Sequence, residues 1–257
     1  MRKPRIIVFD YPQAVSEYPA DTCTVLGEVS AREGRGHSQW TITATLAADT
    51  WMEWGPAHGD EVVYVFDGGL EVDGTVCPPR GCIVIEAGVP ARVRAASTTR
   101  ILHCGSMEPV APREGPLGPA VESGHAVRVV TEQASNPVRY AGPDGVVYDQ
   151  RFYADSTSPT CRLALFGVTA SGASVAAVHS HTQDEIIHVV RGELHVGRLV
   201  IGPGMSVAIQ GEQRYGFSSP GMVEFLNYRR DASYVLLPPN PPRLETAAQM
   251  SAMGGVD

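Results

Sequence analysis

The sequence carries an internal repeat with a spacing of 124 residues. Residues 61–72, EVVYVFDGGLEV, align with residues 185–196, EIIHVVRGELHV. In both segments an acidic residue precedes an apolar run, a turn glycine and a second short run. Further along, residues 80–85 (RGCIVI) and 203–209 (PGMSVAI) each place a glycine turn before a short apolar strand. A repeat of this kind indicates a duplicated structural unit, so the chain is expected to fold as two similar halves.

Short strands separated by turns are predicted along the whole chain. The 257 residues include 27 glycines and 20 prolines, and 43% are apolar, so frequent turns interrupt a chain that can still build a core. Runs of four to eight β-branched and aromatic residues end at Gly, Pro, Asn or Asp, as at 40–46, 127–130, 163–168 and 222–228. This pattern favours an all-β protein with an antiparallel sandwich or barrel in each half and few short helices.

A stretch rich in proline and glycine separates the two halves. Residues 105–126 show no apolar period and are predicted to be a linker. The predicted domains are an N-terminal barrel in 1–104 and a C-terminal barrel in 127–257, which ends in a proline-rich tail. Residues 236–243, LLPPNPPR, cannot extend a hydrogen-bonded strand because proline lacks the N–H donor. Residues 245–253 are expected to form a short helix or an unstructured tail.

Charge and apolar run length exclude several classes of partner. The net charge is −8 and no basic patch is evident, so nucleic acid is not an expected partner. No apolar run approaches the ~20 residues of a membrane span, and the apolar segment of the start, MRKPRIIVFD, is too short for a signal peptide. We therefore expect a cytoplasmic protein with no membrane partner. Lys3 is the sole lysine, which excludes Schiff-base chemistry and a P-loop.

The strongest chemical signal is the segment HSHTQDE, with His179, His181 and Glu185. Side chains two apart on a strand point to the same face, so both imidazoles can meet at one point. A short turn can return Glu185 to that point from the next strand. Two imidazoles and a carboxylate suit a divalent iron, manganese, nickel, cobalt or zinc ion. We predict one such ion per chain.

The N-terminal half lacks this set of ligands. When Glu61 is aligned on Glu185, Gly55 and Ala57 fall at the two histidine positions. One carboxylate cannot form a metal site, so this half is predicted to be structural, with Glu61 a relic or a hydrogen-bond partner. His188 follows Glu185 by three residues, which places it on the opposite strand face, at an expected interface between the halves.

These residues resemble the cupin superfamily. His179, His181, Glu185 and Gly192 reproduce its first motif, H-x-H-x(3)-E-x(6)-G, and residues 204–217 resemble a degenerate form of its second motif, G-x(5)-P-x-G-x(2)-H. The resemblance covers roughly residues 40–104 and 160–235 and therefore both halves, as in a bicupin. It implies two tandem antiparallel jelly-roll barrels with the metal held by inward residues. Such barrels host enzymes, lectins and capsids, so the resemblance does not select a function.

The second motif departs from the family at two positions. Gln210 stands where proline is usual, and Tyr215 stands where a histidine supplies the fourth ligand. Alternation places Gln213, Tyr215 and Phe217 on one face of the strand. Tyr215 could ligate the metal, donate a hydrogen bond to substrate or an oxygen species, or fill the barrel. The remaining two-histidine, one-carboxylate set has open positions, an arrangement associated with non-haem iron oxygenases.

Three functions remain open, each with a small-molecule ligand. The leading hypothesis is an iron(II) dioxygenase for an aromatic or enolic substrate, resembling the quercetinase and gentisate branches, with Tyr215 or Gln213 orienting the reacting group. The second is an isomerase, lyase or cyclase of specialised metabolism that uses the metal as a Lewis acid. The third is a non-catalytic sugar- or effector-binding protein. Arg162, Phe217 and Tyr228 are the predicted substrate-binding residues, and the protein is expected to be a monomer or homodimer.

Overall fold

The computed structural model describes residues 5–11, 18, 21–108, 115–142 and 145–252. Among these residues the elements are 24 strands and one short helix, and no helix is long and apolar enough to cross a membrane. The first half contains β1 (Ile6–Phe9), β2 (Cys23–Leu26), β3 (Val29–Gly36), β4 (Gln39–Leu46), β5 (Trp51–Trp54), β6 (Glu61–Asp67), β7 (Leu70–Val72), β8 (Thr75–Cys77), β9 (Cys82–Ile85), β10 (Ala91–Ala95) and β11 (Thr99–Ser106). The second half contains β12 (Val127–Val130), β13 (Asn136–Ala141), β14 (Val147–Ala154), β15 (Ala164–Ala170), β16 (Ser174–His181), β17 (Glu185–Arg191), β18 (Leu194–Val196), β19 (Leu199–Ile201), β20 (Ser206–Ile209), β21 (Tyr215–Ser219), β22 (Val223–Arg229), β23 (Tyr234–Leu236), β24 (Arg243–Leu244) and α1 (Ala247–Ser251).

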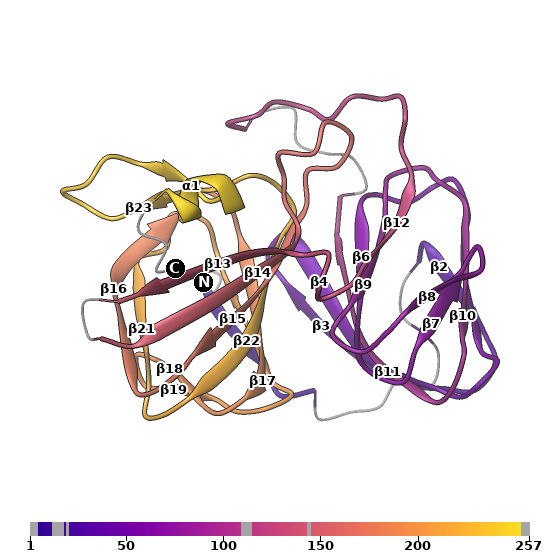
Figure 1. The fold of residues 1–257 in the computed structure, drawn as a ribbon, viewed down its shortest axis with the longest axis horizontal. Helices are drawn as coiled ribbons and strands as arrows, with labels where there is room; N and C mark the ends of the chain where they lie inside the picture. Colours follow the sequence, from indigo (N-terminus) through magenta and orange to yellow (C-terminus); the bar gives the residue numbers. More distant parts are fainter. Residues whose placement is uncertain (1–4, 12–17, 19–20, 109–114, 143–144, 253–257) are drawn as a thin grey trace.

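These strands form two antiparallel barrels that lie side by side (Figure 1). The N-terminal barrel consists of one sheet of order β12-β9-β6-β11-β4-β3 and one of order β2-β5-β10-β7-β8. The C-terminal barrel consists of one sheet of order β1-β20-β17-β22-β15-β14-β13 and one of order β19-β18-β21-β16-β23-β24. Each barrel encloses its own apolar core between its two sheets. The predicted all-β fold of two tandem jelly rolls is confirmed.

The repeat in the sequence corresponds to matching hairpins. β6 and β7 in the first barrel match β17 and β18 in the second, and the turn glycines Gly68 and Gly192 have φ angles of +84° and +76°. A Cβ atom at Gly192 would lie 2.2 Å from the Met222 carbonyl oxygen. Glycine is therefore required there, both for the left-handed backbone and for the close approach of a neighbouring strand.

The two barrels exchange one strand in each direction. β1 pairs with β20 of the C-terminal barrel, and β12 pairs with β9 of the N-terminal barrel. Each exchanged strand covers a sheet edge whose N–H and C=O groups would otherwise lack strand partners. The predicted boundaries at residues 104 and 127 did not include this exchange, because local sequence patterns do not identify which distant edge a strand will join.

Strands at the interface between the barrels are apolar on both faces. In β6, Val63 and Val65 belong to the core of the N-terminal barrel, whereas Val62 and Tyr64 pack in a third cluster with Leu226 of the other barrel. This explains the nearly continuous apolar run of β6, since a strand buried on both faces cannot alternate apolar and polar residues.

A candidate active site in the C-terminal barrel

The C-terminal barrel contains a cavity of about 370 Å³. Phe166, Phe217 and Phe225 contribute to its largely apolar lining. A connected group of polar side chains lines the same cavity, made up of His179, His181, Tyr215, Asn227, Arg229 and Glu245. An apolar cavity with a few convergent polar groups is typical of a small-molecule site.

Three strands supply most of these polar side chains. His179 and His181 lie at the end of β16, where the pairing with β21 shifts register between Ala176 and His179. Such an irregularity re-aims side chains, and here it places His179 opposite Tyr215. The two histidine rings have centroids 4.9 Å apart, and the rings of His179 and Tyr215 have centroids 4.6 Å apart.

Glu185 is the centre of the hydrogen-bond network. The Tyr215 hydroxyl donates to Glu185 Oε1, while Asn227 Nδ2 and Arg229 Nη2 lie 2.8 Å and 3.0 Å from Oε2. Burial alone would raise the pKa of the Glu185 carboxyl, but the neighbouring His181 and Arg229 lower it to about 2. Burial and the Glu185 charge together raise the pKa of Tyr215. Glu185 is therefore an anion with three donors, and Tyr215 keeps its proton.

One ring nitrogen of each histidine faces an oxygen acceptor. His179 Nδ1 lies 2.7 Å from the Ala177 carbonyl oxygen and bonds to it, whereas His181 Nδ1 lies 3.3 Å from Glu245 Oε2 without a hydrogen bond. Burial lowers the pKa of both imidazoles, that of His181 to about 3 with a further contribution from the Arg229 charge. Both rings are therefore neutral at neutral pH.

The donor set fits a divalent ion in its chemistry. Metal-bound imidazoles usually donate the second ring N–H to a carbonyl or carboxylate, as His179 Nδ1 is placed to do toward Ala177. His181 Nε2 lies 3.8 Å from Glu185 Oε1, a gap that ligand bonds of ~2.0–2.2 Å can span. Arg229 Nη2 lies 3.4 Å from His181 Nε2 and so competes for the same ligands. In this arrangement, no three His, Cys, Asp or Glu side chains of the described residues form a complete metal site.

The C-terminal segment closes one end of the cavity. Glu245 lies between β24 and α1, and its Oε2 pairs with Arg229 Nη1. Met250 of α1 also lines the cavity, and Figure 1 shows α1 and β23 across one end of this barrel. The peptide N–H of Ala247 donates to Asp155 Oδ2 over 2.9 Å, which ties the start of α1 to the barrel.

Some polar atoms of the cavity have no protein partner. Gln150 Oε1, Asn227 Oδ1 and Arg229 Nε are buried and make no hydrogen bond with the described residues. Buried polar groups are nearly always paired, with protein, water or ligand. The unpaired acceptors and donor therefore mark where a polar ligand or water would bind in an otherwise apolar cavity.

Phe217 lines the cavity, as predicted, whereas the other two predicted substrate-binding residues lie outside it. Arg162 is buried, and its guanidinium donates to main-chain carbonyls including those of Ser158 and Pro119, at 2.5 Å and 3.0 Å. Tyr228 packs in the apolar cluster between the barrels. Arg162 therefore anchors loops, and Tyr228 belongs to the interface, because both side chains point away from the barrel interior.

Gln213 also lies outside the cavity. β21 begins at Tyr215, so the alternation that was to place Gln213 beside it does not extend that far. The Gln213 side-chain amide donates to the Arg214 carbonyl oxygen over 2.7 Å. The proposed role of Gln213 in orienting substrate is corrected, since its amide is engaged on the preceding loop.

Sequence reasoning missed three residues of the site, Asn227, Arg229 and Glu245, and Arg229 is the most central of them. Phe225, Asn227 and Arg229 alternate along β22 and all line the cavity, while Tyr228 faces the other barrel. Alternation defines two faces of a strand without saying which one is interior. Once Phe225 is assigned to the core, the same alternation identifies Arg229.

The matching position of the N-terminal barrel is built differently. Glu61 accepts hydrogen bonds from Trp54 Nε1 and Thr22 Oγ1 at 2.6 Å and 2.5 Å, and its Oε2 lies 2.7 Å from His103 Nε2. The Tyr18 hydroxyl lies 2.5 Å from His103 Nδ1. Glu61 is thus a hydrogen-bond partner surrounded by aromatic rings, one of the two roles expected from the sequence.

Comparisons with solved structures identify the fold. No family model matches the chain, and a search of curated proteins finds no significant similarity. A putative glyoxylate-induced protein from Pseudomonas aeruginosa superposes with a TM-score of 0.60 and 16% identity, over 84% of this chain and 91% of that one. A variant of Bacillus subtilis oxalate decarboxylase superposes with a TM-score of 0.64 and 13% identity, over 98% and 82% of the two chains. Another structure of that enzyme, concerned with its Mn(II) centres, gives a TM-score of 0.63 and 13% identity, over 87% and 77%. The chain therefore has a two-barrel, bicupin-type fold.

Proposed function

We propose that the C-terminal barrel is the active site of a metal-dependent enzyme that acts on a small organic molecule. The observation that supports this most directly is the cavity of about 370 Å³, in which two imidazoles and three unpaired polar atoms converge among apolar walls, with the buried Glu185 carboxylate hydrogen-bonded to side chains of its lining. The chemistry of these groups is suited to a metal and to an organic ligand with a polar head group.

The proposed metal ligands are His179, His181 and Glu185. A bound divalent ion would supply Lewis acidity or, in the case of iron(II), a centre for dioxygen chemistry. The Ala177 carbonyl oxygen orients the His179 ring through Nδ1, and Arg229 Nη2 would give up its contact with His181 Nε2 to the ion. The proposed occupancy is one ion per chain, because the N-terminal barrel has a carboxylate without the two imidazoles.

The remaining cavity residues would bind and orient the substrate. Arg229 Nε would donate a hydrogen bond to a substrate oxygen, and the Asn227 amide oxygen would accept one from a substrate hydroxyl. Phe166 and Phe217 would pack against the organic body and exclude water. The Tyr215 hydroxyl, held by Glu185, would donate a proton to a substrate oxygen and recover it from solvent or product.

We favour Lewis-acid chemistry of the lyase or isomerase type as the first candidate reaction. The observation behind this choice is the buried network of Tyr215, Glu185 and Arg229, which combines a proton donor, an anion and a fixed cation next to the proposed metal. The similar fold of a manganese-containing decarboxylase agrees with this choice. An iron(II) dioxygenase is the second candidate, because two histidines and one carboxylate leave coordination positions open for dioxygen and substrate.

The test is turnover of metal-free protein reloaded separately with manganese, iron(II) and zinc. A panel of enols, catechols and keto acids would be assayed with and without air, with oxygen uptake recorded. Lewis-acid chemistry predicts turnover without oxygen, whereas a dioxygenase requires iron(II) and consumes oxygen with product. His181→Ala should abolish turnover. The control is His195→Ala, which replaces a surface histidine paired with Glu193 and should leave turnover unchanged.

Turnover that survives metal removal would overturn the proposal. Binding of a metabolite without turnover, seen as a dose-dependent rise in Tm, would instead favour a binding protein.

A further inference from the structure

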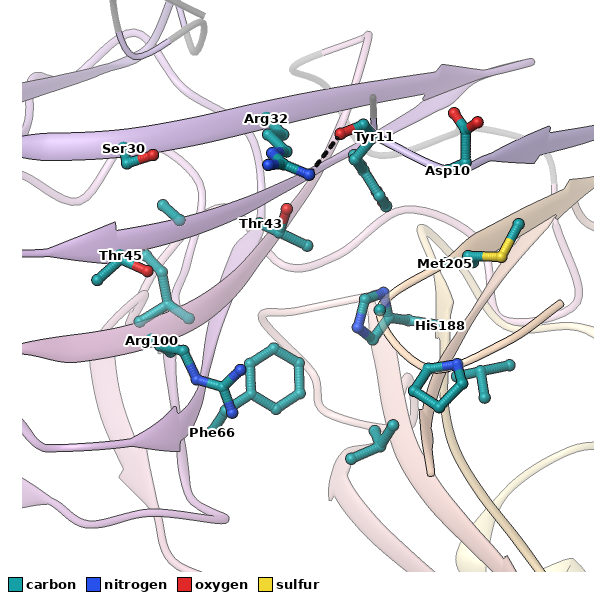
Figure 2. Close-up of a pocket in the computed structure, with 16 residues that line it drawn as sticks. Asp10, Tyr11, Ser30, Arg32, Thr43, Thr45, Phe66, Arg100, His188 and Met205 are labelled. Atoms are coloured by element: carbon teal, nitrogen blue, oxygen red, sulfur yellow. Dashed lines mark hydrogen bonds between the residues drawn. The ribbon is translucent and has the colours of Figure 1, made fainter. Parts of the chain in front are cut away.

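A second cavity, of about 410 Å³, lies between the two barrels. It shares no lining residue with the cavity of the C-terminal barrel. Figure 2 shows side chains from β3, β4 and β11 on one side of this cleft and His188 with Met205 on the other. Both barrels are therefore needed to form it.

Arg32 presents its guanidinium to this cleft. Its Nη1 donates to the Tyr11 carbonyl oxygen over 2.8 Å, the contact dashed in Figure 2. Tyr11 has a φ angle of +49°, an uncommon conformation for a residue other than glycine. Among the described residues no carboxylate pairs with Arg32. One N–H group thus fixes its position, and none of the carboxylates that the structure describes pairs with its charge.

Hydroxyl groups surround Arg32 on the same sheet face. Across β3 and β4, Arg32 is opposite Thr43 and Ser30 is opposite Thr45, and Thr45 is in turn opposite Arg100 of β11. The side chains of Ser30, Thr43 and Thr45 all line the cleft and form no side-chain hydrogen bond with the described residues. The sheet face therefore offers three unpaired hydroxyl groups beside a guanidinium group.

His188 completes the cleft from the C-terminal barrel. The Tyr11 hydroxyl donates to Ser206 Oγ over 2.9 Å, and Ser206 Oγ lies 2.9 Å from His188 Nδ1. Ser206 is fully buried, and His188 Nδ1 is the acceptor available for its single proton. This places the ring proton of neutral His188 on Nε2, the nitrogen left for the cleft. His188 thus adds an N–H donor.

We propose that this cleft is a binding site for a small molecule that carries a phosphate, sulfate or carboxylate group. The Arg32 guanidinium, which pairs with none of the described carboxylates, can surround an oxyanion with donors together with three hydroxyl groups and an imidazole N–H. Arg100 is already paired with Asp67, and Figure 2 shows the Asp10 carboxylate turned away from His188 at the edge of the cleft. The apolar surfaces of Phe66 and Met205 would contact the body of the ligand.

Isothermal titration of the full chain with inorganic phosphate, sulfate and malonate tests this site. At least one anion should bind saturably, and the tightest of the three identifies the phosphate, sulfate or carboxylate class. Arg32→Gln should weaken that binding by about 10- to 100-fold, the usual effect of losing a charged hydrogen bond. The matched control is Arg92→Gln, at an exposed arginine of β10 paired with Glu53, and it should bind like the wild type. His181→Ala should also bind normally, since it alters only the other cavity.

Conservative variants keep the test decisive if Arg32→Gln fails to fold. Thr43→Val and Thr45→Val remove hydroxyls while retaining side-chain shape, and the double variant should weaken anion binding by about fivefold or more. The proposal is overturned if none of the three anions binds saturably to folded wild-type protein. It is also overturned if affinity is unchanged in Arg32→Gln or in the double threonine variant. Loss of binding in His181→Ala alone would place the anion in the barrel cavity and contradict the proposal.

Discussion

The two barrels differ most where their sequences align best. Glu61 and Glu185 begin equivalent strands, and each is a buried acceptor of hydrogen bonds. The partners of Glu61 include Trp54 and His103, whose rings pack edge to face with centroids 5.6 Å apart. The partners of Glu185 instead line an open cavity. One carboxylate lies within a packed core, while the partners of the other, Tyr215, Asn227 and Arg229, line a cavity.

A reciprocal exchange of large and small residues explains much of this difference. Trp40 pairs with Gly105 in the N-terminal barrel, and the residues 124 positions later, Ala164 and Arg229, pair in the C-terminal barrel. A Cβ atom at Gly105 would lie 2.2 Å from the Trp40 ring, so the indole covers that glycine. In the other barrel the small Ala164 accompanies a guanidinium instead. The duplicated framework thus supports a filled barrel and a hollow one that differ in side-chain size at this pair of positions.

Removal of a proposed metal ligand should separate the two barrels most clearly. His181→Ala should reduce metal content toward zero and turnover by more than about 100-fold, because even loss of an outer-shell partner often costs 10- to 100-fold. Glu61→Gln should leave both unchanged, since the N-terminal barrel has no proposed metal. Metal analysis and steady-state rates measure the contrast, and equal losses in both variants would contradict it.

The two barrels also differ in the roles of their tyrosines. Tyr215→Phe should keep metal and fold, because the ring still fills its place, but lower turnover by about 10²-fold through loss of the proton donor. Tyr18→Phe, which removes the hydroxyl that contacts His103 in the filled barrel, should leave the rate unchanged. A fall of less than about tenfold for Tyr215→Phe would assign Tyr215 to packing alone.

Exchange of the large and small residues should affect stability in one barrel and binding in the other. Trp40→Ala should cost about 3–5 kcal/mol of unfolding free energy, because it opens a cavity in a packed core. Ala164→Trp should block ligand binding in the C-terminal cavity by filling the space near Arg229. Denaturant unfolding and titration of a bound ligand measure the two effects. A stable Trp40→Ala variant would show that the N-terminal barrel is not held by this packing.

A smaller contrast concerns pH. His188 and Tyr64 occupy equivalent positions of the repeat, and burial lowers the pKa of His188 to about 4. The unfolded chain, with a histidine pKa near 6.5, binds this proton first, so stability should fall as pH decreases from about 6.5 towards 4. Burial raises the pKa of Tyr64, so Tyr64 adds nothing in this range. His188→Asn should weaken the pH dependence measured by urea unfolding, and an unchanged slope would assign it to other groups.

Local patterns in the sequence predicted the parts of the structure that depend on neighbouring residues. Strand alternation brought His179 and His181 to one face, and the repeat located Glu185 beside them. The strand exchange of β1 and β12 depends on distant sheet edges, which no local pattern records. Tyr228 was misplaced because the inward face of a strand is set by packing. Arg162 was misplaced because it precedes β15 and its guanidinium bonds to loop carbonyls.

Arg229 shows what a closer comparison of the two halves could have revealed. Its repeat partner is Gly105, and the partner of Ala164 is Trp40. Between the two halves, one residue of the pair changes from large to small while its partner changes from small to large. This double change indicates that the interiors of the two barrels are filled differently. Such a signal becomes readable only when strand pairing is known, since residues 40 and 105 are far apart in the sequence.

The most direct test of the account is anomalous diffraction from crystals of the manganese-loaded protein. We predict one anomalous peak per chain, bonded to His179, His181 and Glu185, with ligand distances of about 2.0–2.3 Å. No peak is expected beside Glu61, whose partners are Trp54, Thr22 and His103. A peak at Glu61, or fully loaded protein with no peak at the three C-terminal ligands, would contradict the assignment of the metal and of the active site to the hollow barrel.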